Sequence, residues 1–261
     1  MSNFSVGVDL GGTNLRVAAV DEQGRLMEKV TFGTKTIVGR DHVLNDMCNA
    51  IRQTSAKYQR NGALLGVGIG VPGIIDIQSG MMRESPNLPG WADYPVRAEI
   101  EKRMATPVIL ENDANCAALG EKWLGAGRHV GDMLMLTLGT GVGGGIIIDG
   151  KIHHGMTGMA GEFGHMTVEP DGNQCGCGNR GCLEQYSSAT AVVRMARETI
   201  ATGEAPGLAK AASSDVEFSA KEIYNLAIQG DEGARKIFAG QAVRSGLPWR
   251  PLSTASISKC M

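Results

Sequence analysis

Two stretches of this 261-residue sequence share one plan, VGVDLGGTNLRVAAVDEQG near the N-terminus and LMLTLGTGVGGGIIIDG in the middle. Each pattern predicts a strand, a loop of glycine and threonine, a second strand, and a turn that ends in glycine. We expect strands at 4–10, 15–20 and 25–32 around the first loop, and at 133–138 and 146–148 around the second. Two hairpins with glycine tips therefore organise the fold, and we find no further internal repeat.

The two glycine loops are candidate phosphate-binding loops. Because glycine has no Cβ, backbone N–H groups can approach phosphate oxygens closely, and threonine adds a hydroxyl donor. Neither loop opens a helix and G-x4-G-K-[ST] is missing, which argues against a dinucleotide fingerprint and a P-loop. Tight hairpin turns without a ligand are the alternative. Asp9, on the first strand, is placed to hold Mg²⁺ through water. The candidate phosphate ligands are Gly11, Gly12, Thr13, Gly139 and Thr140.

Helices and strands alternate between the two loops. The hydrophobic pattern predicts helices at 41–60, 94–104 and 114–123, and strands at 64–70 and 108–110. Such alternation indicates an α/β fold, in which ligands bind beyond the carboxyl ends of the strands.

The segment ENDAN, residues 111–115, lies where a predicted strand ends and a helix begins. Asp113 suits the position that caps a helix, and capping alone is one interpretation. The other is that Asp113 is a general base, which would accept a proton from a substrate hydroxyl in phosphoryl transfer. Asn112 is a candidate for hydrogen bonds to a polyol.

The composition argues against several classes of protein. Hydrophobic residues make up 43% of the chain, charged residues 20%, and the net charge is −2, so neither a nucleic-acid nor a membrane partner is indicated. No apolar run reaches the roughly 18 residues that a membrane span needs. The N-terminus MSNFSVGVDL lacks the pattern of a signal peptide. We therefore expect a cytoplasmic protein whose thiols stay reduced.

Three cysteines, Cys175, Cys177 and Cys182, lie among glycines in one short segment. Glycine lets the backbone turn tightly enough for the sulfurs to converge. Zinc prefers four ligands in a tetrahedron, and His165 lies ten residues before Cys175. Three small buried thiols without a metal are the alternative. We predict a structural Zn²⁺ site that holds this loop in place.

Polar residues flank the cysteines and form a candidate sugar-binding set. Each carboxylate can accept hydrogen bonds from neighbouring hydroxyls, and an imidazole adds a further contact. Solvated loop charges are the alternative, and for the segment SPNLPGW a plain loop is the alternative. The candidates are Glu162, His165, Glu184 and, in SPNLPGW, Asn87.

Together, the motifs DLGGTNLR, PNLPGW, ENDAN, LGTGVGGG, GEFGH and CGCGNRGCLE resemble the ROK family of bacterial sugar kinases, above all its ATP-dependent glucokinases. The resemblance covers residues 4 to about 242. It implies an actin-like, ribonuclease-H-like two-lobe ATPase fold with the sugar in the cleft. It also implies phosphorylation of a hexose, with glucose as the first candidate. It also implies that Asp113 is the base, that the polar set with Asn112 binds the sugar, and that the glycine loops bind the phosphates of ATP. His165 would serve both zinc and sugar, one ring nitrogen for each.

The resemblance also divides the chain. It implies an N-terminal lobe at 1–115 with the first phosphate loop and Asp113, and a C-terminal lobe at 116–242 with the second phosphate loop and the zinc loop. After Val243 the helical pattern gives way to RSGLPWRPLSTASISKCM, whereas the family continues with a further helix and strand. One permitted set of codons for these residues, read from the third base, encodes the apolar VGLALAALVNSLNLQMY. We predict that residues 243–261 are an out-of-frame tail and that the C-terminal part of the fold is incomplete.

Other functions share this scaffold. Kinases of N-acetylmannosamine, N-acetylglucosamine, fructose and allose share much of it. The size of the sugar pocket decides which sugar such a kinase accepts, and the spacing of motifs in the sequence does not report that size. A ROK-type sugar-sensing regulator is a second alternative. Such regulators carry a DNA-binding helix-turn-helix ahead of the kinase-like part, whereas we expect the first strand of the kinase-like part to begin here at about residue 4. A zinc-clamped scaffold protein is a third. The family is often dimeric, which leaves a homodimer open.

Overall fold

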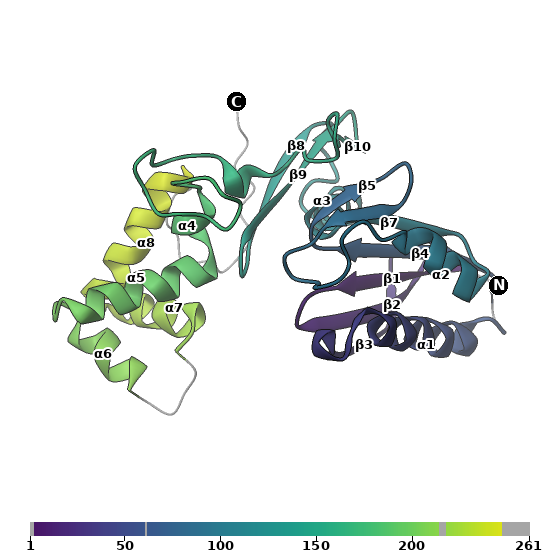
Figure 1. Cartoon of the computed structure of the whole chain (residues 1–261), viewed down its shortest axis with the longest axis horizontal. Coiled ribbons are helices and arrows are strands. Elements are labelled where there is room, and N and C mark those ends of the chain that lie inside the picture. The colour runs from purple at the N-terminus through teal and green to yellow at the C-terminus, as the bar shows by residue number, and fades with distance from the viewer. Residues whose placement is uncertain (1–2, 61, 214–217, 247–261) are drawn as a thin grey trace. The chain divides into compact units, whose positions relative to one another are not determined.

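The computed structural model describes residues 3–60, 62–213 and 218–246 (Figure 1). The chain forms two compact units. Unit 1 comprises Met1–Leu134 and Gly145–Ala160, and unit 2 comprises Met135–Gly144 and Gly161–Met261. The lobe boundary expected at residue 115 falls inside the helix Asp113–Trp123, and the chain first passes between the units later, within a β-hairpin.

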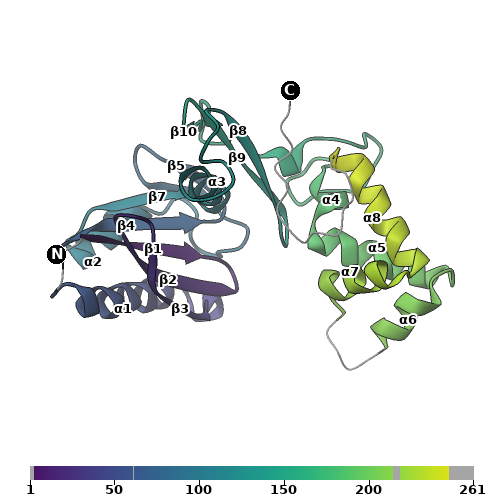
Figure 2. The ribbon, with the colours of Figure 1, turned by 180° about the vertical axis from the view of Figure 1, so that it is seen from behind.

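Unit 1 is built on a five-stranded sheet with the strand order β3-β2-β1-β4-β7 (Figure 2). The first three strands form antiparallel hairpins, as the sequence predicted, whereas β4 pairs parallel to β1 and β7 pairs parallel to β4. Parallel neighbours need crossover connections, which helices provide here. The strands are β1 Phe4–Leu10, β2 Asn14–Asp21, β3 Leu26–Gly33, β4 Leu64–Val71 and β7 Val108–Asn112.

Side chains alternate between the two faces of this sheet. On one face, residues such as Val8, Ile69 and Val71 belong to a buried core that includes the apolar side of helix α1. Gly70 points to the other face, where a Cβ would lie 3.2 Å from Cys116 Sγ. The missing side chain lets helix α3 approach the end of β4 closely. The helices of unit 1 are α1 Arg40–Tyr58, α2 Val96–Met104 and α3 Asp113–Trp123.

A small hairpin, β5 Ile74–Asp76 and β6 Met81–Glu84, follows β4 and was not expected from the sequence. Gly73 precedes it with a φ of +116°, and a Cβ there would lie 2.2 Å from Glu84 O. Only glycine fits both this backbone conformation and this close approach. The hairpin leads into the loop that carries Asn87.

The second predicted hairpin is present, but its strand is longer than expected. Strands β8 Met133–Leu138, β9 Val142–Ile148 and β10 Lys151–Ile152 form a sheet of order β10-β9-β8. The sequence predicted a loop from Gly139 to Gly145, whereas β9 includes the last three of its glycines, Gly143–Gly145. Packing explains this, because a Cβ at Gly144 would lie 2.5 Å from the Phe163 ring and one at Gly145 would lie 2.6 Å from Ala118 Cβ. Glycine within a strand marks such close approach.

Unit 2 is mainly helical after residue 184. Its helices bury one apolar cluster, in which Ala196, Leu208, Ile223 and Ile237 take part. The side chains of Ser188, Ser219 and Asp231 accept hydrogen bonds from the first turns of α5, α7 and α8, and so cap these helices. The helices are α4 Glu184–Ser187, α5 Ala189–Ala201, α6 Pro206–Ala212, α7 Ala220–Gln229 and α8 Glu232–Ser245.

Helix α8 includes the first residues of the predicted out-of-frame tail. Arg244 in its last turn lies 2.9 Å from Glu169 Oε1 through its Nε, and its guanidinium lies 4.8 Å from the centre of the Tyr186 ring. Residues 247–261, on which the rest of that prediction falls, lie outside the described residues. Within the described part of the chain, no helix has the length and apolar character needed to cross a membrane.

Candidate active site and metal centre

The first glycine loop is held by the strands beside it. Gly11 N–H donates to Asn14 O at 2.8 Å, which closes the turn. Thr34, the residue after β3, donates its N–H to Thr13 O at 2.8 Å and its hydroxyl to Gly11 O at 2.7 Å. The conformation of this loop therefore depends mainly on the β1–β3 hairpins.

Two further candidates lie beside this loop in unit 1. A Cβ at Gly12 would lie 2.9 Å from Asn87 O, so the absence of a side chain lets the Asn87 loop approach. Asp9 of β1 pairs with Arg16 of β2, with 2.6 Å between Oδ2 and Nη1, and both side chains are about half exposed. An accessible carboxylate next to a phosphate loop suits a hydrated Mg²⁺ ion.

The ENDAN segment joins β7 to α3. Asn112 is the N-cap, and its Oδ1 accepts from Ala114 N–H at 2.9 Å and Asn115 N–H at 3.2 Å. Its Nδ2 donates to Gly73 O at 3.3 Å. Asp113 is the first helical residue and accepts from Ala114 N–H at 2.8 Å. Capping is thus done chiefly by Asn112, so the helix does not require the Asp113 carboxylate as its cap.

The surroundings of Asp113 suit a base. Partial desolvation of its carboxyl by neighbouring atoms raises the pKa of Asp113, although the residue as a whole stays exposed to solvent. The Ala114 N–H opposes this shift, and the charge of Asp9 adds to it. A raised pKa brings a carboxylate closer to the value that a general base needs near neutral pH. At Cys116, one turn further along α3, burial and then the charges of Glu111, Asp113 and Asp9 raise the pKa of the thiol to about 12, which disfavours the thiolate form.

The second glycine loop is held by α5 from outside its own hairpin. Gly139 N–H donates to Gly141 O at 2.9 Å within the loop. Ala189 N–H, at the start of α5, donates to Gly139 O at 2.8 Å. The Thr190 hydroxyl donates to Thr140 O at 2.9 Å. Gly139 and Thr140, both candidate phosphate ligands, are thus fixed by the first turn of a helix.

Glu184, at the start of α4, also holds this loop. Its Oε2 accepts from Val142 N–H at 2.9 Å, and a Cβ at Gly141 would lie 2.3 Å from the same oxygen. Gly141 therefore makes room for the carboxylate. The sequence indicated Glu184 as a sugar ligand, and both roles are compatible because a carboxylate has two oxygens that accept hydrogen bonds.

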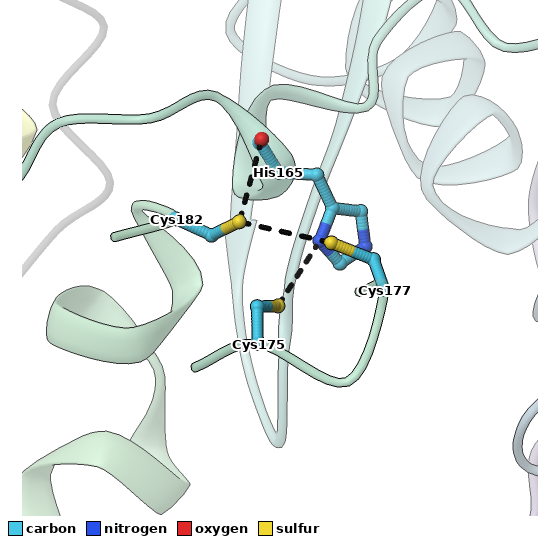
Figure 3. A group of neighbouring side chains, drawn as sticks. All are labelled: His165, Cys175, Cys177 and Cys182. Atoms are coloured by element: carbon cyan, nitrogen blue, oxygen red, sulfur yellow. Dashed lines mark hydrogen bonds between the residues drawn. The ribbon is translucent and has the colours of Figure 1, made fainter. Parts of the chain in front are cut away.

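The three cysteines converge with His165, as Figure 3 shows. Cys175 Sγ lies 3.6 Å from His165 Nδ1, and Cys177 Sγ lies 3.7 Å from Cys182 Sγ. The four ligand atoms all lie within 4.8 Å of one another. A tetrahedral zinc ion with Zn–S of about 2.3 Å and Zn–N of about 2.0 Å separates two sulfurs by about 3.8 Å, and sulfur from nitrogen by about 3.5 Å. These residues therefore fit a zinc ion in both donor type and spacing.

His165 links this cluster to another candidate. While its Nδ1 faces Cys175, its Nε2 lies 3.9 Å from Glu162 Oε2, and both side chains are more than one-third exposed. The structure thus brings together His165 and Glu162 as an accessible polar pair beside the thiols. A metal on Nδ1 would fix the orientation of Nε2.

Glu111 and His154 make a contact that the sequence did not indicate. His154 Nε2 lies 2.7 Å from Glu111 Oε2, and the two are 43 positions apart in the chain. Sequence pattern had assigned no partner to His154. The only signal was an acid, Glu111, directly after the strand expected at 108–110. The structure places Glu111 inside β7, where its carboxylate is buried and therefore needs a partner.

Comparison with known proteins identifies the family. The model of the ROK family matches residues 5–246. The chain belongs to the ROK family. This ROK protein is 43% identical over 236 residues to the glucokinase of Thermotoga maritima, a match that covers 89% of this chain and 72% of the relative. It is 36% identical over 199 residues to a xylose repressor of Caldicellulosiruptor bescii, which covers 76% of this chain and 50% of the repressor.

Solved structures confirm the expected fold. The crystal structure of a ROK family glucokinase from Streptomyces griseus in complex with glucose and AMPPNP matches with a TM-score of 0.76 and 38% identity. The match covers 93% of this chain and 77% of that one. The mixed α/β fold of the actin-like class, which the motifs implied, is therefore correct for this ROK protein.

Proposed function

We propose that this ROK protein is a sugar kinase that transfers the γ-phosphate of ATP to glucose and forms glucose 6-phosphate. The observation that carries the proposal is the Asp113 corner. Asn112 caps α3, which leaves the Asp113 carboxylate for chemistry, and its pKa is raised by partial desolvation. Similarity to glucokinases supports glucose as the sugar.

Asp113 accepts the proton of the glucose 6-hydroxyl as that oxygen attacks the γ-phosphorus. The bond from the γ-phosphorus to the bridging oxygen breaks, and ADP leaves. This role follows from general-base catalysis in phosphoryl transfer. Asn87, Asn112, Glu162, His165 and Glu184 bind the sugar hydroxyls. One Nδ2–H of Asn112 remains for this, because the amide carries two donors and Gly73 O accepts one.

Gly11, Gly12, Thr13, Gly139 and Thr140 bind the phosphates of ATP through N–H and hydroxyl groups. Asp9 would hold Mg²⁺, and the ion would supply positive charge that offsets the charge of the phosphates. The ion pair with Arg16 would orient the Asp9 carboxylate for this role.

His165, Cys175, Cys177 and Cys182 bind a structural Zn²⁺ ion in this proposal. The distances among their ligand atoms support it. A closed set of four protein ligands would leave no position for substrate, so these residues would hold the ion as a structural one that stabilises the loop. Elemental analysis of the purified protein tests this, and a zinc content well below one ion per chain contradicts it.

A coupled assay of ADP release on a panel of sugars tests the function. We expect turnover with glucose to exceed turnover with N-acetylmannosamine, N-acetylglucosamine, fructose and allose. Preference for an N-acetyl sugar or for fructose contradicts glucose and retains the sugar kinase. Sugar binding without ADP release favours the regulator, an alternative that similarity to xylose repressors keeps in view. Cytoplasmic location and a homodimer stay predictions, and gel filtration tests the second.

A further inference from the structure

His154 and Glu111 form a contact in unit 1 that the proposed catalytic roles do not explain. His154 Nε2 and Glu111 Oε2 are 2.7 Å apart, and the side chains are 32% and 10% exposed. His154 follows β10 and Glu111 is in β7, so the contact joins two separate segments of one unit. A carboxylate so far from water is stable only when its oxygens have partners.

The other oxygen of Glu111 holds the corner at which the candidate base lies. Glu111 Oε1 accepts from Asn112 N–H at 2.8 Å and from Asn115 Nδ2 at 3.0 Å. Asn112 in turn caps α3 through the N–H groups of Ala114 and Asn115. One carboxylate thus connects the end of β7 to the first turn of α3. Asp113 lies between the two residues that it holds.

We propose that His154 is a positioning residue for phosphoryl transfer. His154 orients the Glu111 carboxylate, Glu111 holds Asn112 and Asn115, and these two set the direction of the Asp113 side chain. His154 itself touches no reacting atom. This proposal rests on the kinase function proposed above. Because a misplacement of about 1 Å can lower catalysis about 100-fold, the contact controls turnover more than it controls substrate affinity.

Three variants test the role of the imidazole. His154→Ala removes the partner of Glu111, and we expect kcat with glucose to fall about 10- to 100-fold while KM for glucose and for ATP changes less than about threefold. His154→Gln can still donate an N–H to Glu111, and we expect it to recover most of kcat. His153→Ala, at the exposed neighbouring histidine, is the matched control and should retain the wild-type kcat. Wild-type kcat in His154→Ala overturns the proposal.

A double-mutant cycle separates positioning from general loss of structure. If His154 acts through Glu111, adding His154→Ala to Glu111→Gln should change kcat less than about twofold. Full additivity of the two losses overturns the proposal. Thermal unfolding of each variant shows whether it folds. If His154→Ala fails to fold, the kcat of His154→Gln is compared with that of the His153→Ala control, and a large loss of kcat in His154→Gln overturns the proposal.

Amide hydrogen exchange tests the positioning role of His154 separately from the kinase function. Amide hydrogen exchange at Ala114 and Asn115 reports the corner whether or not the protein turns over glucose. We expect faster exchange there in His154→Ala and unchanged exchange in His153→Ala. Unchanged exchange in both overturns the positioning role. A wild-type protein without ADP release refutes the kinase function instead, and leaves the exchange result to judge the contact.

Discussion

The two glycine loops look alike in sequence but are held in different ways. The first, at Gly11–Thr13, is closed by hydrogen bonds from Gly11 and from Thr34, the residue after the third strand of the same meander. The second, at Gly139–Gly141, depends on Ala189 and Thr190 of α5 and on Glu184 of α4. One loop is thus fixed by nearby chain, and the other by helices that follow the cysteine loop.

This difference ties the second loop to the candidate metal site. Cys182 lies two residues before Glu184 in the chain, and Leu183 N–H donates to Met166 O at 2.9 Å. If a metal fixes Cys182, it also fixes the start of α4, whose carboxylate holds Val142 N–H. A disturbance of the cysteines should therefore affect the second glycine loop and spare the first.

The largest expected effect is at Asp113, which belongs to neither glycine loop. Asp113→Asn should lower kcat by about 10²- to 10⁴-fold, because it removes the general base. The folded state raises the pKa of Asp113, so its contribution to stability is full below the unfolded pKa and is lost as pH rises through the folded pKa. At pH 7 the neutral Asn should therefore not lower the thermal unfolding temperature. Kinetics together with a thermal melt check this, and a clearly lower melting temperature contradicts it.

Metal removal is the next test, and it compares the two glycine loops directly. A chelator should free the Glu184 carboxylate from Val142 N–H, a charge-assisted bond worth about 1.5–3 kcal/mol. Amide exchange at Val142 should then speed up by about 10- to 100-fold. Exchange at Gly11 should stay as it was, since its acceptor, Asn14 O, belongs to its own hairpin. Equal acceleration in the two loops would remove the distinction between them.

Alanine in each loop gives a matched pair. Gly12→Ala places a Cβ 2.9 Å from the backbone oxygen of Asn87, which cannot move easily, and should lower the free energy of unfolding by about 1–3 kcal/mol. Gly141→Ala meets the flexible end of Glu184 at 2.3 Å from Oε2, whereas Oε1 lies 4.0 Å away. We expect the side chain to turn so that Oε1 accepts from Val142 N–H instead, and stability should then change by less than about 1 kcal/mol. The second variant should instead raise KM for ATP. Urea unfolding and steady-state kinetics measure the two effects, and a reversed order of stability contradicts the comparison.

Glu184→Gln should have the smallest effect on the second loop. The amide oxygen can still accept from Val142 N–H, but the bond becomes neutral and loses about 1 kcal/mol. We expect KM for ATP to rise about fivefold, which is the corresponding factor. Asp149→Asn, at an exposed turn in unit 1, is the control and should leave KM unchanged. An unchanged KM in Glu184→Gln would assign Glu184 to the sugar alone.

Much of unit 1 could be predicted because its signals are local. Alternating apolar residues and the turn at Gly24 predicted the first three strands within one or two residues of their bounds. The cysteine loop could be predicted as a candidate metal site for the same reason, since its proposed ligands are close in sequence and glycines let the chain turn. The structure adds the convergence of His165 with the three thiols. The roles of the individual site residues stay predictions.

Other features depend on contacts between distant segments. The alternation of apolar and polar residues did not predict that β9 includes Gly143–Gly145. Glycine is favoured at Gly144 and Gly145 because the strand packs closely against Phe163 and Ala118, which a side-chain pattern does not show. Nor could sequence pattern choose, among five histidines, the one that contacts Glu111.

The sequence by itself determined the family, the strands around the first glycine loop, the strand-to-helix corner at Asp113, and the candidate metal ligands. These follow from backbone preferences and side-chain chemistry that act within a few residues. The tertiary structure decided that Glu184 holds the second glycine loop and that His154 partners Glu111. A carboxylate takes its partner from whichever segment packs beside it, and that segment is selected by the whole fold, so local pattern does not encode it.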